Sequence, residues 1–128
     1  MRPTDCNLEK MFILRNEFID KMRKDLPGSY PELPIDLRTK DSQQLCRDLA
    51  LRGVEEMFEA LQHLKNWKPH RQTEFNEGPD REEFLEEIVD ALNYFFSLII
   101  TAGFDEDDLI AAYIKKHDII MKRIEEGY

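Results

Sequence analysis

The segment 91–102 constrains the fold more than any other part of the chain. After Asp90 it is apolar on nearly every side of a helix, and only Asn93, Ser97 and Thr101 interrupt it. A helix that is apolar all round is normally surrounded by other helices or by a second subunit. The segment is well short of the roughly 20 residues that cross a bilayer. We therefore expect the inner helix of a water-soluble helical bundle, without a membrane partner.

Apolar residues at helical spacing predict three further helices, and together they indicate an all-α fold. The expected helices cover about 7–24, 41 or 42 to 65, 80–102 with Asp80 as N-cap, and 105–126 with Asp105 as N-cap. Proline and glycine residues break the chain between 27 and 34, and 66–79 is a long loop. With 128 residues, we expect one domain over 1–128 that forms a bundle of four to five helices.

The net charge of the chain limits its partners. It is −9 at pH 7, whereas binding to a nucleic-acid polymer needs a basic face that releases counterions. Cys6 and Cys46 are too few for a disulfide framework, and the N-terminus lacks the basic and then apolar pattern of a signal peptide. These features predict a soluble cytoplasmic protein that binds no nucleic-acid polymer.

Two acidic motifs, Glu55-Glu56-Met57-Phe58-Glu59 and Glu87-Ile88-Val89-Asp90, lie in the second and third expected helices. Within each motif, carboxylates three residues apart are neighbours on one helix face. Two such pairs face to face would form an oxygen cage suited to Mg²⁺, a cation that serves phosphate chemistry. Each pair alone is also typical of a solvated helix surface. Whether Glu86 or Glu87 faces inward stays open.

Basic residues of the last expected helix complement these acids. Lys116 and Arg123 are seven residues apart and share a helix face, where they could bind phosphate oxygens. Cations near a helix C-terminus are also favourable without any ligand. Arg15 interrupts the apolar face of the first helix, either as a side chain that reaches solvent at a subunit edge or as a group in a binding pocket.

Two other kinds of catalytic site find little support. A di-iron carboxylate bundle uses Glu-x-x-His, but no histidine of this chain follows a glutamate by three residues; His63 follows Glu59 by four. No local motif points to a serine or cysteine nucleophile.

In their order along the chain, these residues resemble the all-α nucleoside triphosphate pyrophosphatases. The resemblance spans about residues 8–128 and rests on the acidic motifs, Trp67-Lys68, Tyr113-x-x-Lys116, Arg123 and Gly127-Tyr128. Dimeric dUTPases and phage dCTPase-dUTPases are the most similar branch, and MazG-type enzymes are more distant. The resemblance implies a homodimer or homotetramer in the cytoplasm of a bacterium or a phage-infected host cell.

The resemblance also implies an activity, the hydrolysis of a (deoxy)nucleoside triphosphate to the monophosphate and pyrophosphate with Mg²⁺, or Mn²⁺ in its place. The implied metal ligands are Glu56, Glu59, Glu87 and Asp90, and Glu55 or Glu56 would orient or deprotonate the attacking water. Lys68, Lys116 and Arg123 would bind phosphates, and Arg15, Trp67 and Asn93 would lie near the base or sugar.

Two departures from the family pattern affect the expected substrate. Arg15 stands where dimeric dUTPases carry a glutamine that reads uracil, and a guanidinium offers only donors. Ile120 stands where the family tends to have an asparagine. We expect dUTP or dCTP first, with dGTP or GTP as the MazG-like alternative, since guanine presents two acceptors. A non-catalytic helical interaction module is a further alternative, against which the intact acidic pairs argue.

Overall fold

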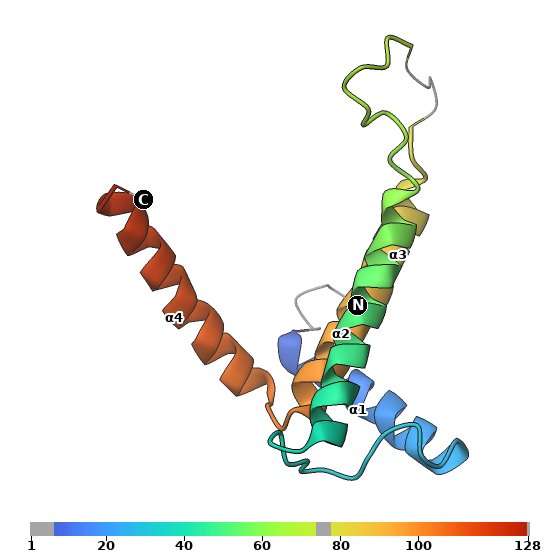
Figure 1. Ribbon diagram of the computed structural model, residues 1–128, viewed down its shortest axis with the longest axis vertical. Helices are drawn as coiled ribbons and strands as arrows, with labels where there is room; N and C mark the ends of the chain where they lie inside the picture. Colours follow the sequence, from blue (N-terminus) through green and yellow to red (C-terminus); the bar gives the residue numbers. More distant parts are fainter. Residues whose placement is uncertain (1–6, 74–77, 128) are drawn as a thin grey trace. The chain divides into compact units, whose positions relative to one another are not determined.

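A computed structural model describes residues 7–73 and 78–127, and this part of the chain is entirely helical apart from its connections (Figure 1). Its four helices are α1 (Leu8–Asp25), α2 (Lys40–Leu61), α3 (Arg81–Thr101) and α4 (Glu106–Glu125). The all-α prediction is confirmed for the described residues, which contain no strand. None of the helices in the described ranges is by itself long and apolar enough to cross a membrane. Cys6 and Tyr128 lie outside the described residues.

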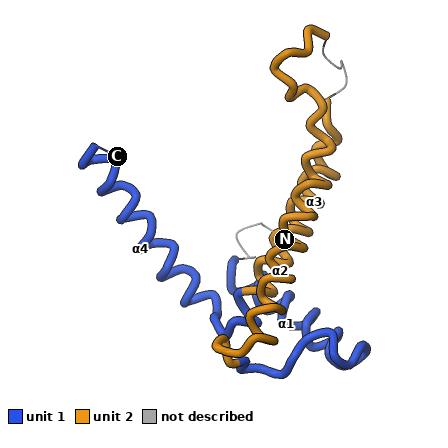
Figure 2. The backbone as a smooth tube through the Cα atoms, viewed as in Figure 1, with its two compact units in different colours: residues 1–35, 99–128 blue, residues 36–98 orange. Residues whose placement is uncertain are grey.

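The chain divides into two compact units (Figure 2). Unit 1 comprises Met1–Ile35 and Ile99–Tyr128 and contains α1 and α4. Unit 2 comprises Asp36–Leu98 and contains α2 and most of α3. Whether the two units fold together as the one domain expected over 1–128 stays a prediction.

Side-chain oxygens cap the helix starts. Asp105 and Asp108 form a capping box at α4, with each carboxylate accepting a hydrogen bond from the other residue's backbone N–H. The Asp80 carboxylate accepts the N–H groups of Glu82 and Glu83 at 3.1 and 3.2 Å. Such bonds satisfy N–H groups that have no partner within the helix. The capping roles expected of Asp80 and Asp105 are therefore confirmed.

The C-terminal end of α2 was placed too late by the sequence. The helix ends at Leu61 instead of continuing to Lys65. The N–H groups of His63 and Leu64 donate to carbonyls three residues back, Ala60 and Leu61, at 3.1 and 3.0 Å. These tighter turns satisfy the last carbonyls of α2 and turn the chain out of the α-helical path.

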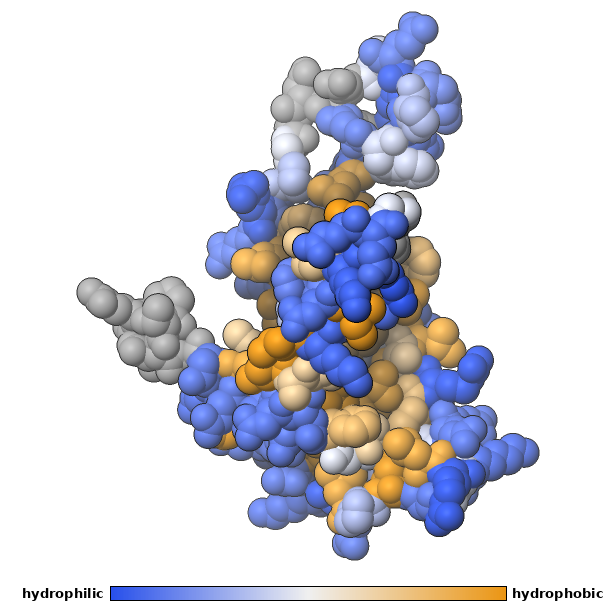
Figure 3. Space-filling view, turned by 90° about the vertical axis from the view of Figure 1, so that its left-hand side faces the viewer, coloured by the Kyte–Doolittle hydropathy of each residue, from blue (hydrophilic) through white to orange (hydrophobic). Residues whose placement is uncertain are grey.

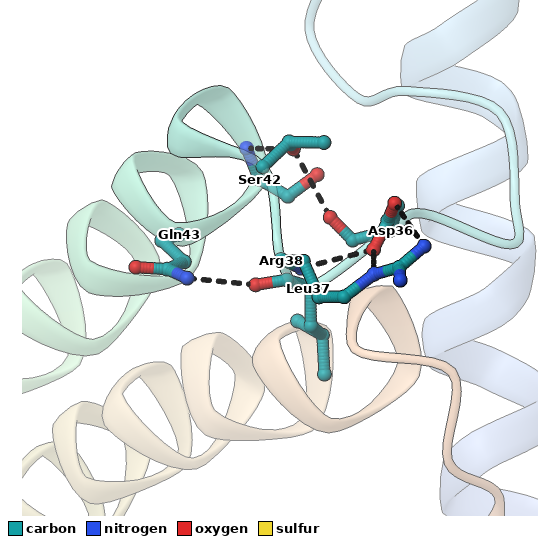
Figure 4. A network of polar contacts seen from close by, with 6 residues as sticks. Asp36, Leu37, Arg38, Ser42 and Gln43 are labelled. Atoms are coloured by element: carbon teal, nitrogen blue, oxygen red, sulfur yellow. Dashed lines mark hydrogen bonds and ion pairs between the residues drawn. The ribbon is translucent and has the colours of Figure 1, made fainter.

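A network of polar contacts fixes the start of α2 (Figure 4). The Arg38 guanidinium donates to both oxygens of Asp36 at 3.0 and 3.1 Å, and this contact lowers the pKa of Asp36. Thr39 caps α2 by accepting the N–H of Ser42, and Gln43 donates to the Leu37 carbonyl at 2.9 Å. The connection into α2 is thereby held by side chains of the connection itself and of the first turn.

Small and aromatic residues form the core of each unit. In unit 1, Phe12 and Ile19 are buried on α1, and Phe18 meets Tyr30 edge to face with ring centroids 6.4 Å apart. In unit 2, Gly53 of α2 faces the ring of Phe95 on α3, and a Cβ at position 53 would lie 2.7 Å from the ring. The Phe95 ring therefore packs directly against the backbone of α2, and a side chain at position 53 would require the ring or the helix to move.

Gly53→Ala is expected to lower the free energy of unfolding by about 1–2 kcal/mol. Overpacking costs roughly 1–3 kcal/mol, and replacing a helical glycine returns up to about 1 kcal/mol. Urea unfolding followed by circular dichroism measures the difference. Gly78→Ala is the matched control, because a Cβ there has no described atom within 4 Å. Equal stability of the two variants would contradict the close approach.

Candidate acidic site and cavity of unit 2

Three carboxylates of unit 2, Glu59 on α2 and Glu87 and Asp90 on α3, act on a fourth, Glu56 on α2. The pKa of Glu56 is raised by its partial burial, by the charge of Glu59 and a hydrogen bond with it, and then by the charges of Asp90 and Glu87. Like charges raise a carboxyl pKa only when they lie close, because the interaction weakens with distance. The structure thus brings together the two acidic pairs singled out in the sequence. Their role as metal ligands stays a prediction.

The orientation of the second pair is settled by burial. Glu87 is half-buried, and its Oε2 lies 3.3 Å from Nε2 of His63. Glu86 is exposed. Glu87 is therefore the residue that faces inward, which answers the question that the sequence left open. Glu55 is also exposed, and its charge is not among those that raise the pKa of Glu56.

His63 is the neighbour of this cluster that the sequence patterns did not identify. Its ring is largely buried and lies 6.2 Å from the ring of Phe84, measured between centroids. The distance to Glu87 permits an ion pair when the ring is protonated, but Glu87 Oε2 has no hydrogen-bond partner among the described residues. His63 lies just beyond α2, four residues after Glu59. That spacing was the only available signal, since it predicts a shared helix face.

The cluster has the donor chemistry of a hard-cation site. All four side chains offer carboxylate oxygens, the ligands that Mg²⁺ prefers. Glu87 Oε2 is buried without a hydrogen-bond partner in the part of the chain described, and Nε2 of His63 lies 3.3 Å from it. Across residues 7–73 and 78–127, no three acidic, histidine or cysteine side chains already converge closely enough to enclose an ion. When Glu56 is protonated, its carboxyl group donates a hydrogen bond to Glu59.

A cavity of about 690 Å³ lies at the C-terminal end of α2. Its lining includes the aromatic rings of Phe58 and Trp67 and the cationic side chains of Lys65, Lys68 and Arg71. Trp67 is 68% exposed, and Lys68 Nζ lies 5.7 Å from the centroid of its ring. A planar anionic molecule would find both stacking surface and positive charge here. Phe58 belongs to the first acidic motif, so one stretch of α2 contributes to the cavity and to the carboxylate cluster.

The remaining predicted site residues are distributed over both units. Asn93 is half-buried on α3 in unit 2, three residues after Asp90. Arg15 lies in unit 1, where its guanidinium carbon is 3.9 Å from the centroid of the Phe18 ring on the same helix. Lys116 and Arg123 are exposed on α4, also in unit 1. Unit 2 therefore carries the predicted metal ligands together with Trp67 and Lys68, and unit 1 carries the other predicted phosphate-binding cations and Arg15.

Comparisons with protein-family models, with curated proteins and with solved structures gave no significant match.

Proposed function

We propose that this protein hydrolyses a (deoxy)nucleoside triphosphate to the monophosphate and pyrophosphate with the help of Mg²⁺, or Mn²⁺ in its place. The observation that carries the proposal is that Glu59 on α2 and Glu87 and Asp90 on α3 all lie close enough to raise the pKa of Glu56. Acidic side chains that lie close together repel one another, and this repulsion opposes folding unless a bound cation offsets it. A cation-binding role would explain why the four carboxylates lie close together despite their repulsion.

The proposed roles follow from the position of each side chain. Glu56, Glu59, Glu87 and Asp90 would hold the metal, which when bound polarises phosphoryl oxygens and lowers the pKa of a bound water. The raised pKa of Glu56 suits a group that accepts a proton from that water, because a stronger base removes a proton more readily. Glu55 is exposed on the same helix and is the second candidate for this role.

The cavity at the C-terminal end of α2 supports a nucleotide as substrate. Trp67 offers an aromatic face for a base, and Lys68 offers a cation for phosphate. Lys116 and Arg123 would bind further phosphate oxygens, and Asn93 would lie near the sugar or base. The protein would act as a homodimer or homotetramer in the cytoplasm. dUTP or dCTP is the proposed substrate, and dGTP or GTP is the alternative.

A panel of all common ribonucleoside and deoxyribonucleoside triphosphates, incubated with the protein and Mg²⁺, tests this proposal. Chromatography should detect a monophosphate and pyrophosphate in equal amounts from at least one of them. The bond that breaks joins the α- and β-phosphates, so orthophosphate should not appear as the first product. Turnover of no nucleotide, or release of orthophosphate in place of pyrophosphate, would refute the proposal.

Arg15→Gln is expected to change the ratio of kcat/KM between pyrimidine and guanine substrates by about 10-fold or more. An amide offers an acceptor and donors, whereas the guanidinium offers donors alone, and one such contact is worth roughly 1–3 kcal/mol. The Mg²⁺ concentration that gives half the maximal rate should stay the same. Rates for dUTP, dCTP and dGTP before and after the substitution provide the measurement. An unchanged substrate profile would show that Arg15 only covers Phe18.

A further inference from the structure

The C-terminal helix α4 presents a continuous apolar stripe to solvent. Its side chains recur at separations of three, four and seven residues and so lie on one side of the helix: Ile110, Tyr113, Ile114, Ile120, Met121 and Ile124. The structure describes the whole of α4, and none of its residues is buried. Tyr113 and Ile124 are 74% and 57% exposed. Apolar residues also reach the surface on the face shown in Figure 3. A stripe of this length is normally covered by another element.

Unit 1 itself covers only the start of the stripe. Leu8 of α1 and the first turns of α4 line a shared cavity of about 320 Å³. Every residue of α4 from Ile110 onward is exposed, and Figure 2 shows α4 extending from the rest of unit 1 as a single rod. No other described element of unit 1 therefore covers the second half of the stripe, which includes Ile120 and Ile124. A helix from outside unit 1 could pack there.

The two borders of the stripe carry opposite charges. Lys116 and Arg123, seven residues apart, follow one border, and Asp118 and Glu125, also seven apart, follow the other. At 3.6 residues per turn, each pair lies roughly 100° from the middle of the stripe. Two parallel helices related by a two-fold axis place the left border of one beside the right border of the other, whereas antiparallel helices place like borders together. The charges of α4 thus favour a parallel copy of itself.

We propose that α4 pairs with α4 of a second copy of this chain, parallel and in register, through this stripe. In that register Lys116 lies near Asp118 of the second copy, and Arg123 lies near Glu125 of the second copy. His117 is the one polar residue within the stripe and meets its own counterpart, and a single polar position of this kind fixes the register of paired helices. Arg123 has five donors, so pairing with a carboxylate leaves others for phosphate. The pairing does not depend on the proposed reaction.

Light scattering coupled to size-exclusion chromatography provides the first test. The full chain should have at least twice the 15.3 kDa mass of one copy, and Ile124→Asp should reduce it to 15.3 kDa with its helical circular dichroism retained. Ile119→Asp is the matched control, because Ile119 lies on the opposite side of α4 and its substitution should leave the mass unchanged. A monomeric full chain would overturn the proposal and indicate that the stripe is covered within one copy. An Ile124→Asp variant that keeps the mass of the full chain would overturn it as well.

Disulfide cross-linking tests the orientation in a chain whose stripe is otherwise intact. With Cys6 and Cys46 replaced by serine, Ile124→Cys should form a covalent dimer with itself under mild oxidation, and Ile119→Cys should form several-fold less. If Ile124→Cys does not cross-link to itself but does cross-link to Ile110→Cys in a mixture, the helices are antiparallel and the proposal is wrong. Neither test measures turnover, so an inactive dimer would refute the proposed reaction alone.

Discussion

Glu59→Gln and Asp90→Asn are each expected to lower the rate of pyrophosphate release by at least about 100-fold. Loss of a residue that merely supports a metal ligand typically costs 10- to 100-fold, and loss of the ligand itself should cost more. Each substitution keeps the size of the side chain and removes one negative charge from the group that surrounds Glu56. Steady-state rates at saturating Mg²⁺, with pyrophosphate as the measured product, provide the test.

Glu86→Gln is the matched control for these two variants. Glu86 is exposed on α3, next to Glu87 in sequence, so its substitution removes the same charge from the same helix without touching the cluster. It should keep its rate within about 2-fold of the parent. Circular dichroism should show all three variants folded, because none of the three side chains is buried. Retained turnover in Glu59→Gln or Asp90→Asn would remove that residue from the metal site.

Glu56→Gln is expected to stabilise the metal-free protein at pH 7 by about 0.5 kcal/mol while it abolishes the stabilisation that Mg²⁺ provides. The folded-state pKa of Glu56 is raised, so the folded protein binds this proton more tightly than the unfolded chain does. Stability is then lost as pH rises from the unfolded pKa through the folded pKa. At pH 7 the charged Glu56 opposes folding, and each close like-charge neighbour costs about 0.2–0.5 kcal/mol.

Thermal unfolding of the parent and the variant, with EDTA and with millimolar Mg²⁺, measures both parts of this prediction. In EDTA the variant should unfold at the higher temperature, and the difference should shrink as the pH falls below the ordinary glutamate pKa of about 4.3. In Mg²⁺ the parent should gain about 1.4 kcal/mol for each tenfold excess of the ion over its dissociation constant, and the variant should gain much less. A parent that is more stable than the variant in EDTA would contradict the repulsion that we infer at Glu56.

The starts of the helices were more predictable from the sequence than the end of α2. Asp80 and Asp105 have oxygens that accept the N–H groups of the residues just after them, and such local bonds leave a pattern in the sequence. No glycine or proline marks the end of α2, where His63 and Leu64 leave the helix through bonds to carbonyls three residues back. Apolar spacing alone predicted four more helical residues there than the structure contains.

The pairing of carboxylates within each helix was also predictable, because it depends only on helical spacing. What the spacing could not supply is the environment of each group. His63 approaches Glu87 from the turn after α2, a contact between residues distant in sequence. The choice between Glu86 and Glu87 depends likewise on the partner helix, since both lie near the edge of the inward face. Long-range packing decides such cases, and a single sequence does not record it.

The close approach at Gly53 bears on the cation binding that we propose for the carboxylates. Mg²⁺ requires oxygen ligands at about 2.0–2.1 Å, whereas Ca²⁺ accepts 2.3–2.6 Å, so selection between them depends on cavity size and rigidity. Glu56 lies one turn after Gly53, and the ring of Phe95 sets the spacing of α2 and α3 at that level. A methyl group added at position 53 would displace the Phe95 ring or spread the helices, and would thereby change the distances between the proposed ligands of α2 and α3. We expect Gly53→Ala to improve Ca²⁺ binding relative to Mg²⁺ in a competition titration, while an unchanged ratio would show that the cage is insensitive to helix spacing. Discrimination between ions would then reside in an apolar contact that touches neither the metal nor its ligands.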